Sequence, residues 1–137
     1  SVLQMNITLS IIEIGKNEFT LSSAAMPPIY FYNAKDGLLE EFSNNGLPLG
    51  SLRNEEYVLE KRKFREGDVL VQFSDGLPEA PNLAGDLYDY DRLKSLIQNS
   101  CHLSANEIID TLVKSVDEWM QGQSNPDDIT LVVTKKK

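Results

Sequence analysis

The stretch that decides the fold is Val69-Leu70-Val71-Gln72-Phe73-Ser74-Asp75-Gly76-Leu77-Pro78-Glu79-Ala80. Its first five residues alternate with the two-residue period of a β-strand, and Ser-Asp-Gly then forces the backbone to turn. The strand would hold the Asp75 carboxylate in one direction, and Gly76 would let other groups approach closely. This arrangement is typical of a metal site or a catalytic acid. Taken alone, however, an Asp-Gly pair after a strand is more often an ordinary turn whose Asp bonds its own backbone.

A second acidic stretch near the C-terminus mirrors the first. Asn125-Pro126-Asp127-Asp128 stands immediately before the apolar run 129–133, which is predicted to be a strand. If the two strands are antiparallel neighbours, the end of one lies beside the start of the other, and Asp75 and Asp127 converge. Two carboxylates held close together repel each other unless a cation lies between them. Hard oxygen ligands of this kind suit Mg²⁺ or Mn²⁺.

Four motifs, taken in chain order, resemble those of the metal-dependent phosphatases of the protein phosphatase 2C class. The first two are Ala25-Met26-Pro27-Pro28 and Gly46-Leu47-Pro48-Leu49-Gly50, and the last two are the acidic stretches around Asp75 and Asp127. The chain is most similar to the bacterial branch that includes the stage II sporulation protein E and the regulators of sigma-factor partner switching. The resemblance covers nearly the whole chain but only the C-terminal portion of the family domain. We therefore expect one domain over residues 1–137, and we expect the family's first metal-binding Asp and its Gly-Asp and Gly-His-Gly segments outside this chain.

The resemblance implies a reaction and the residues that support it. The reaction is hydrolysis of phosphoserine or phosphothreonine on a regulatory protein in bacterial signalling, of the anti-sigma-factor antagonist type, by metal-bound water without a covalent intermediate. Asp75 and Asp127 correspond to direct ligands of a two-metal Mn²⁺ or Mg²⁺ site whose other ligands lie outside this chain. Gly76 corresponds to the small residue beside the metal, and Asp128 to a residue that orients a ligand or a bound water. No side chain corresponds to a catalytic nucleophile.

One family motif departs from its usual sequence. Where the family usually has Ala-Gly-His-Pro-Pro, Ala25 and Met26 replace Gly and His, so we expect a structural loop without a polar role near the substrate.

Two other functions remain open. The alternative function is a non-catalytic regulatory or protein-binding module with a degenerate phosphatase fold, although intact Asp75 and Asp127 speak against full degeneration. A calcium-binding β domain would need an EF-hand or repeat-loop spacing, which the sequence lacks.

Composition and charge restrict the partners. The chain has 137 residues, of which 41% are hydrophobic and 25% charged, as in ordinary folded domains. Its net charge of -8 argues against nucleic acid or an anionic membrane, because both need clustered Lys and Arg. No apolar run approaches the ~20 residues of a membrane span, and the N-terminus lacks the order of a signal peptide.

The single cysteine indicates a reducing setting. Cys101 cannot form an internal disulfide, so we expect a cytoplasmic protein. A nucleophile and base pair made of Cys101 and His102 is disfavoured, because adjacent residues usually point apart and no third orienting group is present.

The periodicity of the chain predicts an α+β fold. It is an antiparallel β-sheet, part of a β-sandwich, with two C-terminal helices packed on one face, in the order βββββ-β-αα-β. Strands are predicted over 5–14, 19–23, 29–32, 38–42, 57–64, 69–73 and 129–133. The mixed charges of the strand over 57–64 indicate an exposed edge with a solvated face, which we favour over contact of its basic residues with a phosphorylated partner.

Two helices are predicted between the last two strands. The first covers 91–98, and the second follows a capping box of Ser104 and Glu107. The apolar residues at helical spacing after the cap are Ile109, Leu112, Val113, Val116, Trp119 and Met120. We expect Trp119 and at least one of Tyr88 and Tyr90 in the core. Because strands of the family fold are expected outside this chain, we also expect exposed edges and a homo-oligomer.

Overall fold

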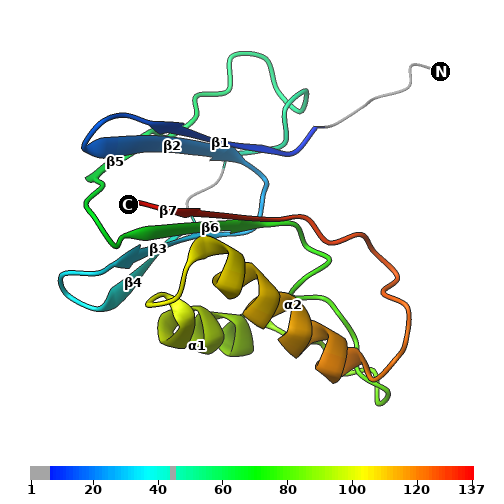
Figure 1. The fold of residues 1–137 in the computed structure, drawn as a ribbon. Helices are drawn as coiled ribbons and strands as arrows, with labels where there is room; N and C mark the ends of the chain where they lie inside the picture. Colours follow the sequence, from blue (N-terminus) through cyan, green and yellow to red (C-terminus); the bar gives the residue numbers. More distant parts are fainter. Residues whose placement is uncertain (1–6, 44–45) are drawn as a thin grey trace.

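The protein is built as two stacked antiparallel β-sheets with two helices covering the outer face of one sheet (Figure 1). The structure is a computed structural model that describes residues 7–43 and 46–137. Its elements are β1 (Leu9–Ile14), β2 (Glu18–Ala24), β3 (Ile29–Asn33), β4 (Leu38–Phe42), β5 (Glu60–Lys63), β6 (Val69–Phe73), α1 (Tyr90–Ser100), α2 (Ala105–Met120) and β7 (Leu131–Lys135). One sheet has the order β1-β2-β5 and the other β4-β3-β6-β7. The predicted order of strands and helices is confirmed.

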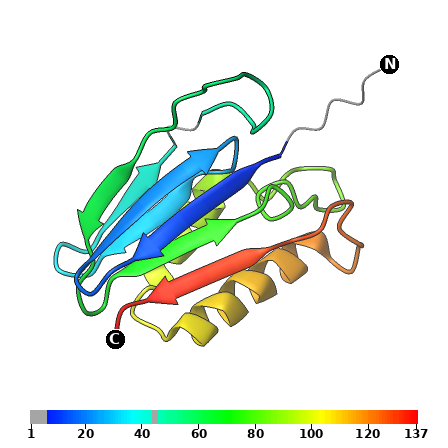
Figure 2. The same ribbon diagram turned by 90° about the horizontal axis from the view of Figure 1, so that it is seen from above.

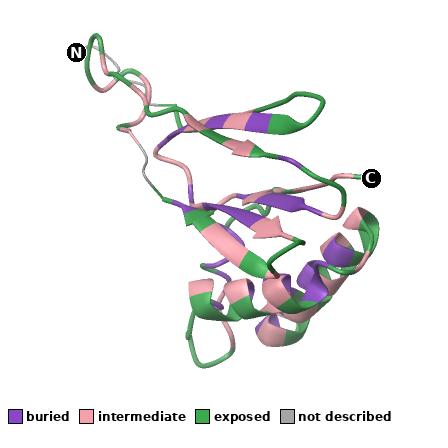
Figure 3. Ribbon diagram, turned by 90° about the vertical axis from the view of Figure 1, so that its left-hand side faces the viewer, coloured by how far each residue is buried: buried purple, intermediate pink, exposed green. Residues whose placement is uncertain are grey.

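The period-2 alternation of β6 separates two hydrophobic cores. Val69, Val71 and Phe73 belong to the core between the larger sheet and the helices, whereas Leu70 belongs to the core between the two sheets. All four side chains are buried. Figure 3 shows that buried residues lie in the strands of both sheets and on the side of the helices that faces the larger sheet. The inter-sheet core is aromatic, and its Phe19 ring makes an edge contact with Phe31 at a centroid distance of 4.9 Å. Because β6 contributes to both cores, its end is held firmly, which favours a functional group placed there.

The second helix begins at the predicted cap but is rotated slightly from the predicted face. The Glu107 backbone N–H donates to Ser104 Oγ at 3.2 Å, and the Ser104 N–H donates to the Glu107 carboxylate at 3.3 Å. The prediction that Val113 is buried is wrong, because its side chain is 43% exposed. The helix uses an i, i+4 stripe that starts one residue earlier, and the buried residues are Ile108, Leu112, Val116 and Met120. Ile109 is only partly buried.

Two predicted strands are shorter in the structure. The strand predicted over 5–14 is β1, beginning at Leu9; residues 5 and 6 lie outside the described residues. The strand predicted over 57–64 is only β5, and it does lie at a sheet edge as predicted. Two of its cations are paired: Lys61 with Glu18 at 3.1 Å and Arg62 with Glu40 at 2.7 Å. Since β5 and β4 belong to different sheets, the Arg62 pair links the sheets at their edges.

The residues from 81 to 89, which connect the segment after β6 to α1, are attached to the helix layer through Trp119. Its indole N–H donates to the Ala80 carbonyl at 3.0 Å and lies 3.2 Å from the Asp86 carbonyl. The Trp119 ring contacts Tyr88 edge-on, and the Arg92 guanidinium lies over it at 4.0 Å. Trp119 is half-buried and Tyr88 is buried, which confirms the prediction of a core tyrosine. The loop that follows β6 and Asp75 is therefore ordered by side-chain contacts.

Strand β1 leaves an exposed apolar edge. Among the described residues it pairs only with β2, and Figure 2 shows it as the dark blue arrow beside β2. Its side chains Leu9, Ile11 and Ile14 are 42%, 57% and 46% exposed. An unprotected apolar edge of this kind favours pairing with another chain.

This edge predicts self-association that one substitution should weaken. Ile11→Lys places a charge on the exposed edge, so we expect a lower mass at high protein concentration than for the wild type, measured by multi-angle light scattering. The control is Leu83→Lys, because Leu83 is 66% exposed but lies in the loop after β6. A wild-type protein that stays monomeric at millimolar concentration would contradict the prediction.

No helix in the described part of the chain is long and apolar enough to cross a lipid bilayer.

Candidate metal centre

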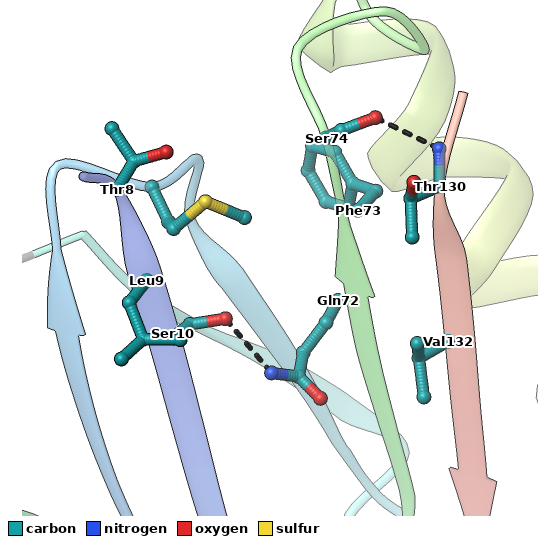
Figure 4. A pocket seen from close by; sticks show the side chains of 9 residues that line it. Thr8, Leu9, Ser10, Gln72, Phe73, Ser74, Thr130 and Val132 are labelled. Atoms are coloured by element: carbon teal, nitrogen blue, oxygen red, sulfur yellow. Dashed lines mark hydrogen bonds between the residues drawn. The ribbon is translucent and has the colours of Figure 1, made fainter. Parts of the chain in front are cut away.

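The structure places the two acidic stretches side by side. Strands β6 and β7 are antiparallel neighbours, with Phe73 opposite Leu131, as the sequence analysis assumed. The ladder continues one step further, because the Ser74 N–H donates to the Thr130 carbonyl at 2.9 Å. Ser74 Oγ also accepts from the Thr130 N–H at 2.8 Å, a bond drawn in Figure 4, and donates to the Asp128 carbonyl at 3.3 Å. The Ser74 hydroxyl thus connects the segment that carries Asp75 to the segment that carries Asp128.

Gly76 is the point of closest approach between these segments. A Cβ atom added to Gly76 would lie 2.2 Å from the carbonyl oxygen and 2.9 Å from the carbonyl carbon of Asp128. Both atoms belong to the backbone, which cannot move aside as a flexible side chain can. Any larger residue at this position would therefore separate Asp75 from the Asp127–Asp128 pair. The need for glycine here arises from this close approach.

The close approach gives a stability prediction. Gly76→Ala should lower the free energy of unfolding by about 2–3 kcal/mol, because the clash can be relieved only by moving backbone. The matched control is Gly15→Ala, since a Cβ atom there would lie 3.5 Å from its nearest neighbours, at ordinary contact distance. Urea unfolding of both variants measures the difference. Equal, small losses would show that the two acidic segments are not packed as described.

Asn125 joins the two segments from the other side. Its side-chain Nδ2 donates to the Gly76 carbonyl at 2.9 Å, and its Oδ1 accepts from the Asp127 N–H at 3.1 Å. One half-buried amide thus fixes the turn after β6 and the turn before β7 together. No role was predicted for Asn125 from the sequence. Its position two residues before an Asp, next to Pro126, is a turn signal that could have suggested one.

The Asp75 and Asp127 side chains are available to a cation. Both residues are exposed, and no hydrogen bond to the Asp75 carboxylate occurs among the described residues. Asp127 Oδ1 accepts from the Asp128 N–H at 2.8 Å, which orients this carboxylate and leaves its second oxygen available. The orienting group is thus the backbone of Asp128.

The donor set fits part of a metal site. Carboxylate oxygens on adjoining rigid turns are suitable ligands for Mg²⁺ or Mn²⁺. The described residues contain no group of three or more acidic, His or Cys side chains that could hold a metal ion. Two carboxylates fit one side of a coordination shell, and the rest of the shell must be supplied by water or by other residues.

Tyr90 belongs to the surroundings of Asp75, although its sequence position predicted only a core or surface aromatic. Burial raises the pKa of the Tyr90 phenol, and the nearby carboxylates of Asp75 and Glu79 raise it further. Its ring packs against Phe73 at a centroid distance of 6.3 Å. A neutral phenol therefore lies near Asp75, at the first residue of α1.

An apolar hollow of about 220 Å³ adjoins the candidate centre (Figure 4). It lies between β1 and the β6–β7 pair, which are bridged by a 2.9 Å hydrogen bond from Gln72 to Ser10. Met26 lines it, at the position where the family usually has His. Ala25 adopts a φ of 54°, a left-handed conformation that favours glycine, which the family usually has there. Residue 25 thus adopts a backbone conformation that favours glycine, and Met26 lines the hollow with an apolar side chain.

Cys101 and His102 do not form a second site. Burial raises the pKa of the Cys101 thiol to about 12, so the thiol stays protonated at neutral pH. Its neighbour His102 is exposed. The prediction that this pair is not catalytic agrees with the geometry, because a buried thiol is neither ionised nor accessible.

Known proteins are similar to this chain in sequence or in fold. Phosphoserine phosphatase RsbU of Bacillus subtilis is 31% identical over 124 residues, which are 90% of this chain and 36% of RsbU. Among solved structures, the SiaA-PP2C domain of Pseudomonas aeruginosa has a TM-score of 0.75 at 17% identity and covers 88% of this chain and 47% of its own. The Mn-presoaked phosphatase domain of SpoIIE from Bacillus subtilis has a TM-score of 0.67 at 18% identity, with coverages of 96% and 56%.

These coverages show that the chain spans about a third of the length of RsbU and about half of each solved domain. The sequence profile of the stage II sporulation protein E (SpoIIE) family matches residues 3–137, almost the whole chain. The resemblance inferred from four motifs is therefore confirmed, and the chain belongs to the SpoIIE family.

Proposed function

We propose that residues 1–137 form the C-terminal portion of a metal-dependent serine/threonine phosphoprotein phosphatase domain. The observation that carries this proposal is the contact of Gly76 with the Asp128 backbone, which brings Asp75 and Asp127 onto adjoining turns. The name of RsbU, a phosphoserine phosphatase, and the manganese treatment of the SpoIIE crystal support it. The remaining metal ligands belong to residues outside this chain.

Each residue of the candidate centre has a proposed role. Asp75 and Asp127 offer carboxylate oxygens to the metal ions, and the Asp128 N–H holds the Asp127 carboxylate in place. Gly76 and Asn125 keep the two turns together. When bound, the Mn²⁺ or Mg²⁺ ions supply an activated water and neutralise charge on the phosphoryl group. The substrate is a phosphorylated regulatory protein of the anti-sigma-factor antagonist type, and the setting is the bacterial cytoplasm.

The second candidate function is that of a non-catalytic module. Such a module would have a degenerate phosphatase fold and would bind a partner protein without chemistry. Met26, which stands where the family usually has His, is the observation that favours it. The availability of both carboxylates favours the enzyme, because a module without chemistry has no need to keep two repelling charges on adjoining turns.

The proposal predicts a difference between this chain alone and a completed domain, in which a segment with the remaining family ligands precedes it. This chain alone should show no Mn²⁺-dependent hydrolysis of a phosphoserine peptide, because two carboxylates leave most of the coordination shell open. The completed domain should show turnover. Metal-dependent turnover by this chain, lost in Asp75→Asn, would show that its site is complete. A completed domain that binds the phosphoprotein without turnover would favour the non-catalytic module.

A further inference from the structure

A basic hollow lies at the end of the sandwich opposite to the candidate metal centre. It has a volume of about 570 Å³ and is formed by the β1–β2 turn, the residues between β5 and β6, and the C-terminal residues after β7. Arg65 and Glu66 of the hollow stand before β6, and Asp75 stands after it. A strand rises ~3.3 Å per residue, so the length of β6 and its flanking residues separates the two sites by about 20 Å. The hollow is therefore separate from the phosphatase chemistry.

Cations outnumber carboxylates in its lining. The charged residues that line it are Lys63, Arg65, Lys136, Lys137, Glu18 and Glu66. Glu18 is already paired with Lys61 at 3.1 Å. Lys63, Arg65 and Lys137 make no ion pair with any of the described residues. On a chain with a net charge of -8, this is a local concentration of unpaired positive charge.

The backbone that carries these cations is held by a buried carboxylate. Asp68, which is 2% exposed, accepts the Arg65 N–H at 2.8 Å and the Ala34 N–H at 2.8 Å. The Lys136 N–H donates to the Asp68 carbonyl at 2.9 Å, and the Gly67 N–H donates to the Lys136 carbonyl at 2.9 Å. The bases of the cationic side chains are thus fixed before any ligand arrives, which lowers the entropic cost of binding.

The β1–β2 turn is attached to the same frame. Lys136 Nζ donates to the Lys16 carbonyl at 2.7 Å, and the Phe64 N–H donates to the Asn17 carbonyl at 2.8 Å. Three segments that are far apart in the sequence therefore form one rigid wall. The ends of Lys63 and Arg65 remain free to donate hydrogen bonds to an incoming anion.

We propose that this basic hollow docks an acidic segment of a partner protein through Asp or Glu side chains. A guanidinium such as Arg65 matches a carboxylate with two parallel hydrogen bonds, and a lysine ammonium adds a point charge. A nucleic acid or an anionic membrane presents a continuous array of negative charge. Glu18 and Glu66 in the lining and the net charge of -8 would repel such an array, whereas a short peptide can place its carboxylates between them.

The test uses a fluorescein-labelled decapeptide of Asp, Glu and Gly, titrated with this protein at low and at physiological ionic strength and followed by anisotropy. The test variant combines Lys63→Glu with Arg65→Glu. The control combines Arg53→Glu with Lys114→Glu, which changes the net charge equally at two exposed residues outside the hollow. A second test variant, Lys63→Gln with Arg65→Gln, removes the cations without reversing charge. Circular dichroism checks that all variants are folded.

We expect both test variants to weaken peptide binding at least about tenfold, because each removes two charge-assisted hydrogen-bond donors. The control should weaken it by less than about twofold at physiological salt, where distant charges are screened. Equal weakening by test and control variants would overturn the proposal, since binding would then follow net charge alone. It would also be overturned if a single-stranded oligonucleotide or a phosphatidylserine vesicle bound more tightly than the peptide. None of these results depends on phosphatase activity.

Discussion

Asp75→Asn and Asp127→Asn should each abolish Mn²⁺-dependent hydrolysis of a phosphoserine peptide by the completed domain. The expected loss in kcat/KM exceeds about 100-fold, because even residues that only orient metal ligands contribute about 10–100-fold. The amide replaces a carboxylate oxygen with a group that carries no charge, so it cannot balance a divalent cation. The assay is peptide hydrolysis at saturating Mn²⁺.

The same two variants should remain folded. Removing one of two neighbouring negative charges relieves repulsion, so the metal-free protein should be as stable as the wild type or slightly more stable. The matched control is Asp36→Asn, because Asp36 is an exposed carboxylate in the β3–β4 turn, outside the candidate centre. Near wild-type turnover by a folded Asp75→Asn or Asp127→Asn protein would contradict the assignment of that residue as a ligand.

The second large effect is expected at Trp119. Trp119→Ala should lower the free energy of unfolding by about 3 kcal/mol, the lower end of the usual range for a packed tryptophan, because this one is half-buried. The substitution removes the indole hydrogen bond to the Ala80 carbonyl and the contacts with Tyr88 and Arg92. The loop over 81–89 should also become more accessible to proteases, since Trp119 is one of its two attachments to α2 among the described residues, the other being the 2.7 Å hydrogen bond between the Tyr88 and Ser115 hydroxyls.

The comparison for Trp119 is the helix cap. Ser104→Ala removes the cap of the same helix and should cost about 1 kcal/mol. Urea unfolding of both variants gives the ratio of the two losses. Equal, small losses would mean that Trp119 does not anchor the loop and would make it a candidate for partner binding.

Local patterns predicted the frame of the candidate centre well. Alternation in β6, the apolar run of β7 and the turn residues after and before them placed Asp75 and Asp127 at strand ends. That the two segments adjoin was an assumption about strand pairing, and the antiparallel pairing of β6 with β7 confirms it. The cap at Ser104 was predicted for a similar reason. Its hydrogen bonds join residues only three positions apart, so the sequence contains the whole motif.

Contacts between distant residues could not be read in this way. Asn125 bonds the Gly76 carbonyl across 49 positions, and Lys136 Nζ bonds the Lys16 carbonyl across 120. Neither contact leaves a periodic pattern. The buried face of α2 was displaced by one residue because Ile108 and Ile109 are both apolar, and only packing against the sheet decides which one is buried. Likewise, the net charge of -8 does not indicate the basic hollow, because its lining residues come from three segments that are far apart in the sequence.

The most direct test of the central claim, that Asp75 and Asp127 are ligands of the same metal site, is Mn²⁺ titration of this chain followed by amide signals in ¹H–¹⁵N NMR spectra. Weak binding is sufficient, because the paramagnetic ion broadens signals of nearby residues even at low occupancy. We predict that broadening begins at Ser74–Gly76 and at Asp127–Asp128 together, and that Asp75→Asn removes it from both segments. Broadening that begins elsewhere, or that persists at Asp127 in the Asp75→Asn protein, would contradict a shared site.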